Sequence, residues 1–71
     1  MENWKNYISK YDIRNAARAA GVDRENYNLS RKLQPEEWTS AMVAINYELK
    51  RIVIEREMRR AEFIKEANAT C

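Results

Sequence analysis

Apolar residues in the second half of the chain recur at spacings of three and four positions, which is the period of an α-helix. Some of these residues form one apolar line along the predicted helix, which we call the first apolar line. Three arginines, Arg56, Arg59 and Arg60, interrupt it, so its C-terminal part is predicted to lie in water or in salt bridges. We expect the line to pack against the N-terminal part of the same chain. Its members are Trp38, Met42, Ile45, Leu49, Ile52 and, further on, Phe63.

The start of this helix is predicted from the stretch "LQPEEW" (33–38). Pro35 fits the first helical position, and two glutamates follow it beside the positive end of the helix dipole. Leu33 and Trp38 have the spacing of a hydrophobic staple. A helix over 35–68 is roughly 50 Å long, whereas a compact chain of this length is only about 30 Å across. The helix is therefore predicted to project beyond its own domain.

A second apolar line lies on nearly the opposite side of the same helix. Because a helix on a protein surface needs only one apolar face, a second face predicts a second partner. We expect it to pair two copies of the chain, most simply as a two-fold homodimer of helical hairpins. The alternative is a monomer in which one wide core covers both faces. The predicted dimer interface comprises Val43, Tyr47, Ile54, Met58 and Ala61.

The N-terminal third predicts short helices, because the chain's few β-branched residues do not alternate with polar ones as strands require. Asn3 is a candidate N-cap of a first helix. Asp12 either caps a second helix that begins at Ile13 or lies inside a helix that continues to Ala20. The only glycine, Gly21, ends it in either case. An apolar face is expected from Trp4, Tyr7, Ile8 and Tyr11.

These patterns predict an all-α fold in a single domain over 1–71. Short helices over 1–33, with a turn at Gly21, pack on a long dimerisation helix over 35–68. The net charge is only +2, from 13 basic and 11 acidic residues, and by itself it does not indicate a nucleic-acid partner. The charge is uneven, however, since residues 5–32 hold seven basic and three acidic groups, a local excess of four.

Residues 13–32 resemble the helix-turn-helix unit of DNA-binding proteins, in particular its short type with an "AA..LG(V/I).R" core. The matching stretch here is "AARAAGVDR", residues 16–24. The small pair Ala16 and Ala17 falls where the two helices of that unit cross closely, and Gly21 falls at the turn. The alternative is a plain helical corner.

The match is incomplete on the second helix of the unit. Tyr27 takes the expected apolar place, but Ser30 occupies the last apolar position of the pattern. Asp23 and Glu25 bring negative charge to the start of that helix, where it opposes phosphate and also suits a helix N-terminus.

The resemblance implies a second helix over Asp23–Lys32 that lies on DNA. Arg24 and Asn28 are the candidates for base edges, because arginine offers guanine a fork of two donors and asparagine pairs a donor with an acceptor. Phosphate contacts are expected from Arg14, Arg18, Arg31 and Lys32. The long helix then pairs two copies for one palindromic site.

Catalytic and metal chemistry are not expected. The chain has no histidine, its one glycine forms no phosphate-binding loop, and its single cysteine, Cys71, has no neighbouring base. No metal, cofactor or catalytic residue is therefore predicted. No apolar run approaches the ~20 residues that a membrane span needs, and no signal segment is visible, so a cytoplasmic location is expected.

In its brevity and its lack of catalytic residues, the chain is similar to small accessory proteins of bacteriophage early operons. That similarity implies regulation by binding in the cytoplasm of a host. The first hypothesis is a dimeric DNA-binding regulator. The alternative is an adaptor or inhibitor that presents its long helix, or the basic group Arg56, Arg59 and Arg60, to a host enzyme. A third is a structural assembly protein.

Overall fold

The computed structural model describes residues 3–69, and every regular element in that range is helical. This confirms the predicted all-α class. The molecule measures 49 × 22 × 16 Å, far from spherical. In chain order the elements are a 3₁₀ turn η1 (Trp4–Tyr7), α1 (Lys10–Ala20), α2 (Glu25–Ser30), a 3₁₀ turn η2 (Pro35–Glu37) and α3 (Ser40–Ala69).

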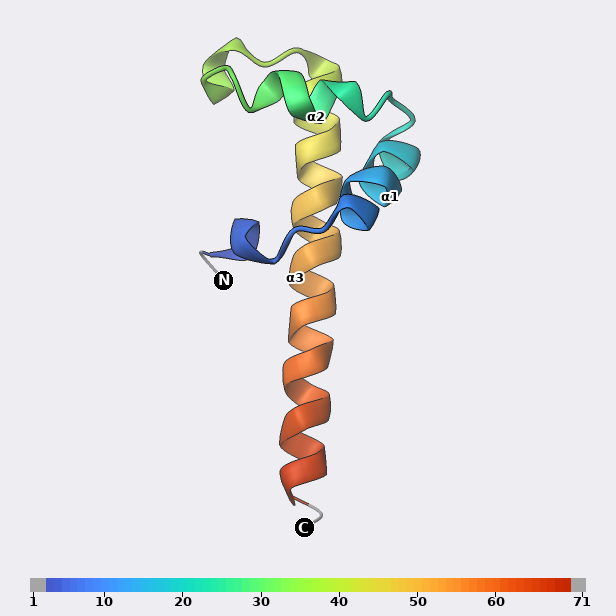
Figure 1. Ribbon diagram of the computed structural model, residues 1–71, viewed down its shortest axis with the longest axis vertical. Coiled ribbons are helices and arrows are strands. Elements are labelled where there is room, and N and C mark those ends of the chain that lie inside the picture. Colours follow the sequence, from blue (N-terminus) through green and yellow to red (C-terminus); the bar gives the residue numbers. More distant parts are fainter. Residues whose placement is uncertain (1–2, 70–71) are drawn as a thin grey trace.

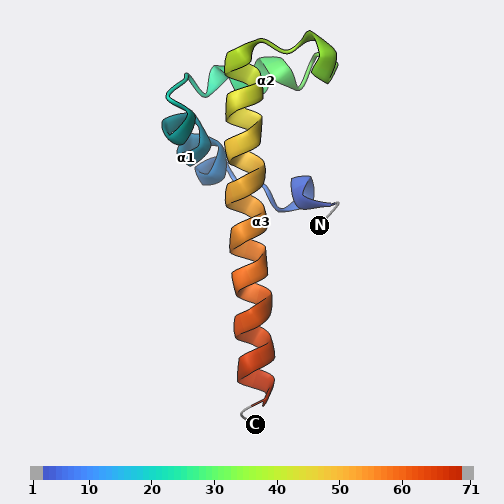
Figure 2. The same ribbon diagram turned by 180° about the vertical axis from the view of Figure 1, so that it is seen from behind.

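The α3 helix is a rod, and the rest of the chain gathers around its N-terminal half (Figure 1). The α1 helix lies on one side of α3 and η1 on the other, and α2 lies across the end where α3 begins. The view from behind shows the same arrangement, with the C-terminal half of α3 standing clear of every other element (Figure 2). The prediction that the long helix projects beyond its own folded part is confirmed.

The start of α1 is fixed by a capping box that was not predicted. The Ser9 hydroxyl accepts the Asp12 backbone N–H at 3.3 Å, and the Asp12 carboxylate accepts the Ser9 N–H at 2.9 Å. This reciprocal pair satisfies two backbone donors at a helix start. Asp12 is therefore the third residue of α1, and the option of a helix beginning at Ile13 was wrong. Asn3 makes no side-chain cap and precedes only η1.

Gly21 ends α1, as predicted. Its φ is 70° and its ψ is 30°, the left-handed conformation that glycine adopts at little cost. The Gly21 N–H bonds to the carbonyl of Arg18, and the Val22 N–H bonds to that of Ala17 at 3.1 Å. These are the two bonds of a Schellman motif, which turns the chain sharply out of the helix.

The long helix begins later than predicted, at Ser40 instead of Pro35, and has 30 residues. Pro35 opens the short η2 turn, and Trp38 then adopts an extended backbone with φ −70° and ψ 140°. Thr39 caps α3, since its hydroxyl accepts the Met42 N–H at 3.4 Å. The α-helix start at Pro35, across which Leu33 and Trp38 were expected to form a staple, is therefore wrong.

The core is the contact between α1 and α3. The two small residues Ala16 and Ala17 pack with Ile45, Leu49 and Val53 of α3. The close crossing that the sequence predicted between the two helices of a helix-turn-helix unit is therefore made by α1 and α3 instead of α1 and α2. Of the first apolar line, Met42, Ile45 and Leu49 are buried as predicted. The next fully buried position is Val53, while Ile52 only borders the core and Phe63 is exposed.

Candidate nucleic-acid interface

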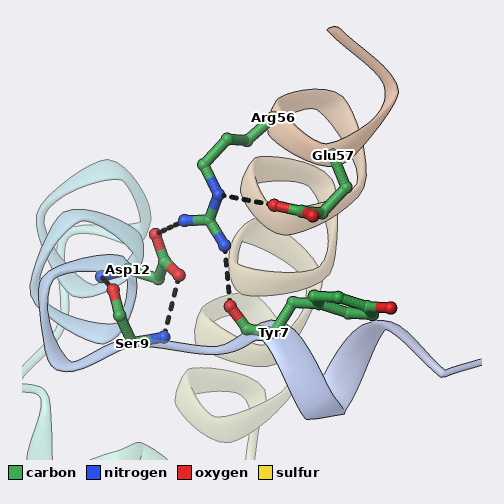
Figure 3. A network of polar contacts seen from close by, with 5 residues as sticks. All are labelled: Tyr7, Ser9, Asp12, Arg56 and Glu57. Atoms are coloured by element: carbon green, nitrogen blue, oxygen red, sulfur yellow. Dashed lines mark hydrogen bonds and ion pairs between the residues drawn. The ribbon is translucent and has the colours of Figure 1, made fainter. Parts of the chain in front are cut away.

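One guanidinium group links the N-terminal segment and α1 to α3, in addition to the apolar core. Arg56, on α3, donates to the Asp12 carboxylate on α1, to the Tyr7 carbonyl at 2.7 Å, and to Glu57 at 3.1 Å (Figure 3). Figure 3 shows the Arg56 guanidinium between the carboxylates of Asp12 and Glu57, with one of its nitrogens directed at the Tyr7 carbonyl. The network ties three segments together at the last point where α3 is covered.

The ionisation of Asp12 reflects these contacts. Burial favours the neutral acid and by itself raises the pKa of Asp12, whose side chain is only 6% exposed. Hydrogen bonds from Arg56 and from the Ser9 backbone and hydroxyl act in the opposite sense and outweigh burial. The pKa of Asp12 therefore lies below its usual range. The hydrogen bond to Asp12, followed by that to Glu57, raises the pKa of Arg56.

The α2 helix is held by a second polar network. The buried Ser30 hydroxyl donates to the Tyr27 carbonyl at 2.7 Å and accepts from the Asn46 amide of α3 at 2.9 Å. The Trp38 indole donates to the Ser30 carbonyl at 2.9 Å. This explains why a serine stands where the helix-turn-helix pattern has an apolar residue, since Ser30 joins α2, α3 and the loop between them.

The three carboxylates within residues 5–32 are all engaged within the chain. Asp12 pairs with Arg56, Asp23 accepts the Glu25 N–H at 2.8 Å, and Glu25 accepts from the Asn28 amide at 3.4 Å. The Asp23 bond closes the turn before α2. The negative charges of Asp23 and Glu25, at the start of the helix proposed to lie on DNA, are therefore used in local hydrogen bonds.

The basic side chains of residues 5–32, unlike these carboxylates, are not paired within the part of the chain that the structure describes. All seven are exposed, and none forms an ion pair with another residue of the described range 3–69. On α1, three of them stand one turn apart on the outer face. Lys10 on α1 lies over the Tyr11 ring, and Arg31 lies over the Tyr27 ring, with 5.9 Å from its Cζ to the ring centroid. The seven are Lys5, Lys10, Arg14, Arg18, Arg24, Arg31 and Lys32.

The structure brings some of the predicted site residues together and separates others. Asn28, Arg31 and Lys32 line one shallow hollow at the end of α2. Arg24 lies just before α2, and Arg14 and Arg18 lie on α1. The predicted helix over Asp23–Lys32 is too long, because α2 has only six residues and a turn takes over at Arg31.

The predicted dimer interface is an exposed surface of the single chain. Tyr47 is 67% exposed, Val43, Met58 and Ala61 are also exposed, and Ile54 is half-buried. A hollow of about 640 Å³ opens at the head of this face, lined by Val43 and Tyr47 together with α1 residues and Trp38. Pairing of two copies through this outer face remains a prediction.

The three arginines of the basic group that was expected to contact a host enzyme are in different environments. Arg56 is occupied by Asp12, Tyr7 and Glu57, so it belongs to the internal network. Arg59 and Arg60 are exposed on the projecting half of α3. The sequence gives no sign of this division, because Arg56 and Asp12 are 44 positions apart.

Among residues 3–69 there is no group of three or more side chains suited to hold a metal ion. Nor does any helix within that range have the length and apolar character needed to cross a membrane. Cys71 lies outside the described residues. No family model matches the chain, and neither a search of curated proteins nor one of solved structures finds a match.

Proposed function

We propose that this chain is a non-enzymatic DNA-binding protein that applies the basic surface of α1 and α2 to the duplex. The observation that carries the proposal is the asymmetry of charge use within residues 5–32. The three carboxylates of this range are engaged in internal bonds, whereas its seven cations are exposed and without ion pairs in the described part of the chain. Exposed lysine and arginine clusters attract phosphate and release its counterions.

In this proposal Arg14, Arg18, Arg31 and Lys32 contact phosphates. Arg24 and Asn28 approach the base edges. Because α2 has fewer than two turns and Glu25 already holds the Asn28 amide, few base contacts are available. Affinity is therefore expected to come chiefly from phosphate contacts and to depend steeply on salt.

The test is fluorescence anisotropy with a labelled duplex of random sequence at about 50 mM and about 200 mM salt. The wild type is expected to bind at low salt and weaken steeply at high salt. Arg31→Ala and Lys32→Ala are each expected to lower affinity and to reduce the salt slope by about 1.

The matched control is Lys50→Ala, which removes an exposed cation from α3 outside the proposed surface. It is expected to leave both affinity and slope unchanged. Absence of binding by the wild type at low salt, or equal losses in all three variants, overturns the proposal.

A second candidate function is protein association through α3, and we propose a second copy of this chain as the partner. It is favoured by the line of exposed Val43, Tyr47 and Met58, with the half-buried Ile54 among them, on the side of α3 away from the core. Large apolar residues aligned along one helix face are typical of helix pairing. Such pairing gives two DNA-binding surfaces in one particle. Both candidates suit a small regulatory protein of the cytoplasm.

The chain offers a well-matched control for this second candidate. Tyr47 on α3 and Tyr11 on α1 are 67% and 64% exposed, so they present almost the same apolar side chain to water on different faces. In sedimentation over a wide concentration range, Tyr47→Ser is expected to weaken dimerisation and Tyr11→Ser to leave it unchanged. A wild type that remains monomeric at every concentration, or equal effects of both variants, contradicts self-association.

A further inference from the structure

A cleft of about 400 Å³ opens beside the N-terminal half of α3, between η1, α2 and η2. Three aromatic side chains contribute to its wall, namely Trp4 from η1, Tyr27 from α2, and Trp38, which follows η2. Pockets of this volume that have aromatic and aliphatic walls and a few polar groups are typical sites for small ligands. The aromatic wall favours a flat apolar ring as the occupant.

Three polar side chains of the wall are bonded within the chain. The Asn46 amide donates to the Ser30 hydroxyl and to the Met42 carbonyl, and the Ser30 hydroxyl donates to the Tyr27 carbonyl. The Trp38 indole donates to the Ser30 carbonyl. These bonds hold the wall of the cleft in place. The same N–H and O–H groups are therefore already used and do not attract a ligand.

The wall also contains two cations, each beside one of its aromatic rings. The Lys5 Nζ lies 5.9 Å from the centroid of the Trp4 ring, and the Arg31 Cζ lies 5.9 Å from that of Tyr27. Neither cation forms an ion pair within residues 3–69, and no carboxylate is among the described residues that line the cleft. The cleft is therefore positively charged and complementary to a negative ligand.

Two other hollows of the described surface lack this combination of rings and cations. The larger hollow at the head of the outer face of α3 contains the carboxylate of Glu48 and no lysine or arginine. The shallow hollow at the end of α2 contains Arg31 and Lys32 but no aromatic ring. Of these three hollows, only the cleft offers a ligand both an aromatic wall and unpaired positive charge.

We propose that the cleft binds a small aromatic anion, that is, a flat ring with one attached carboxylate or phosphate group. The ring lies among Trp4, Tyr27 and Trp38, and the anionic group lies against Lys5 and Arg31. Arginine suits either anion, because a guanidinium group donates two parallel hydrogen bonds to a carboxylate or to a phosphate. A neutral ring lacks this attraction, and a cationic ligand is repelled. The inference goes beyond the proposed DNA binding and does not depend on it.

The test is an NMR titration of the full chain with naphthoate, with naphthyl phosphate and with the neutral naphthalenemethanol, all substituted at the same ring position. Trp4 and Trp38 are the only tryptophans of the chain, and both line the cleft, so their indole N–H signals report its occupation. At least one anion is expected to shift both signals. The anion that binds more tightly identifies the group that the cleft takes. The neutral alcohol is expected to bind about tenfold more weakly than that anion.

Two variants and a matched control test the charges. Lys5→Gln and Arg31→Gln are each expected to lower the affinity for that anion by about three- to fivefold, since both cations are exposed. The control is Lys10→Gln, which removes an exposed cation 5.6 Å from the centroid of the Tyr11 ring, outside the cleft. It is expected to leave the affinity unchanged. Indole signals that do not move with any probe overturn the proposal. So does a neutral alcohol that binds as tightly as the anions, or an equal effect of Lys5→Gln and Lys10→Gln.

Discussion

Arg56 and Asp12 form an ion pair across 44 positions of sequence, and this pair joins α1 to α3 where the folded part of the molecule ends. Asp12 is also the residue whose carboxylate completes the cap of α1. One side chain therefore both starts α1 and fixes it on α3, which makes the pair the first target for mutation.

Replacing Asp12 by asparagine is expected to lower the free energy of unfolding by about 1–3 kcal/mol. The amide leaves Arg56 without its anionic partner, but Arg56 is 40% exposed, so water replaces part of what is lost. Urea unfolding followed by circular dichroism measures the change. Glu55→Gln is the control, because its pairing with Arg51 is largely exposed and the change is expected to cost under about 0.5 kcal/mol. Equal losses in the two variants contradict a special role for Asp12.

The lowered pKa of Asp12 predicts an acid-sensitive contribution to stability. Because the folded state holds this carboxylate ionised more strongly than the unfolded chain, the contribution is complete above the unfolded pKa of about 3.9. It is lost as the pH falls from there through the lower folded pKa. Asp12→Asn removes this dependence. The stability difference between wild type and variant is therefore expected to be larger at about pH 6 than at about pH 2–3. A difference that is constant with pH refutes the assignment.

Gly21 is expected to resist substitution for conformational reasons alone. Its φ of 70° is unfavourable for an L side chain, yet a Cβ added there meets no other atom within 4 Å. Gly21→Ala is therefore expected to lower stability by about 1–2 kcal/mol without disturbing the packing. Gly21→Asn is expected to cost less, since asparagine visits the left-handed region more readily. Thermal unfolding measures the stability of both variants. If Gly21→Asn lowers stability as much as Gly21→Ala does, the conformational explanation is contradicted.

The bond between Ser30 and Asn46 is expected to position α2 more than it stabilises the whole chain. Asn46→Ala removes the donor to Ser30, although the Ser30 hydroxyl keeps its bond to Tyr27. A loss of about 1 kcal/mol is expected, with increased amide exchange confined to α2 and the loop after it. Asn68→Ala, on the exposed end of α3, is the control. Increased exchange throughout α1 and α3 contradicts a local role.

The apolar periodicity predicted the elements of this fold more reliably than their ends. Met42, Ile45 and Leu49 follow the three- and four-residue rule because all three lie on the buried side of α3. The helix start was predicted too early, at Pro35, because proline suits the first position of a 3₁₀ turn as well as that of an α-helix. The bond of the Trp38 indole to Ser30 accompanies an extended backbone that local preference does not indicate.

The site was predictable to a lesser extent, because its geometry depends on contacts distant in sequence. The cap formed by Ser9 and Asp12 has a three-residue spacing that the sequence does display. The choice of Arg56 over its neighbours as the partner of Asp12 has no local signal. Similarly, the polar role of Ser30 has no local signal, because its partners Asn46 and Trp38 are 16 and 8 positions away.

The uncovered half of α3 has a thermodynamic consequence. Its last turns receive no support from tertiary packing, and helices of about a dozen residues are only marginally stable alone in water. When these turns are frayed, a partner that binds them as a helix must first order them. Binding there therefore costs conformational entropy. Warming should therefore weaken such binding before it unfolds the anchored half of the molecule.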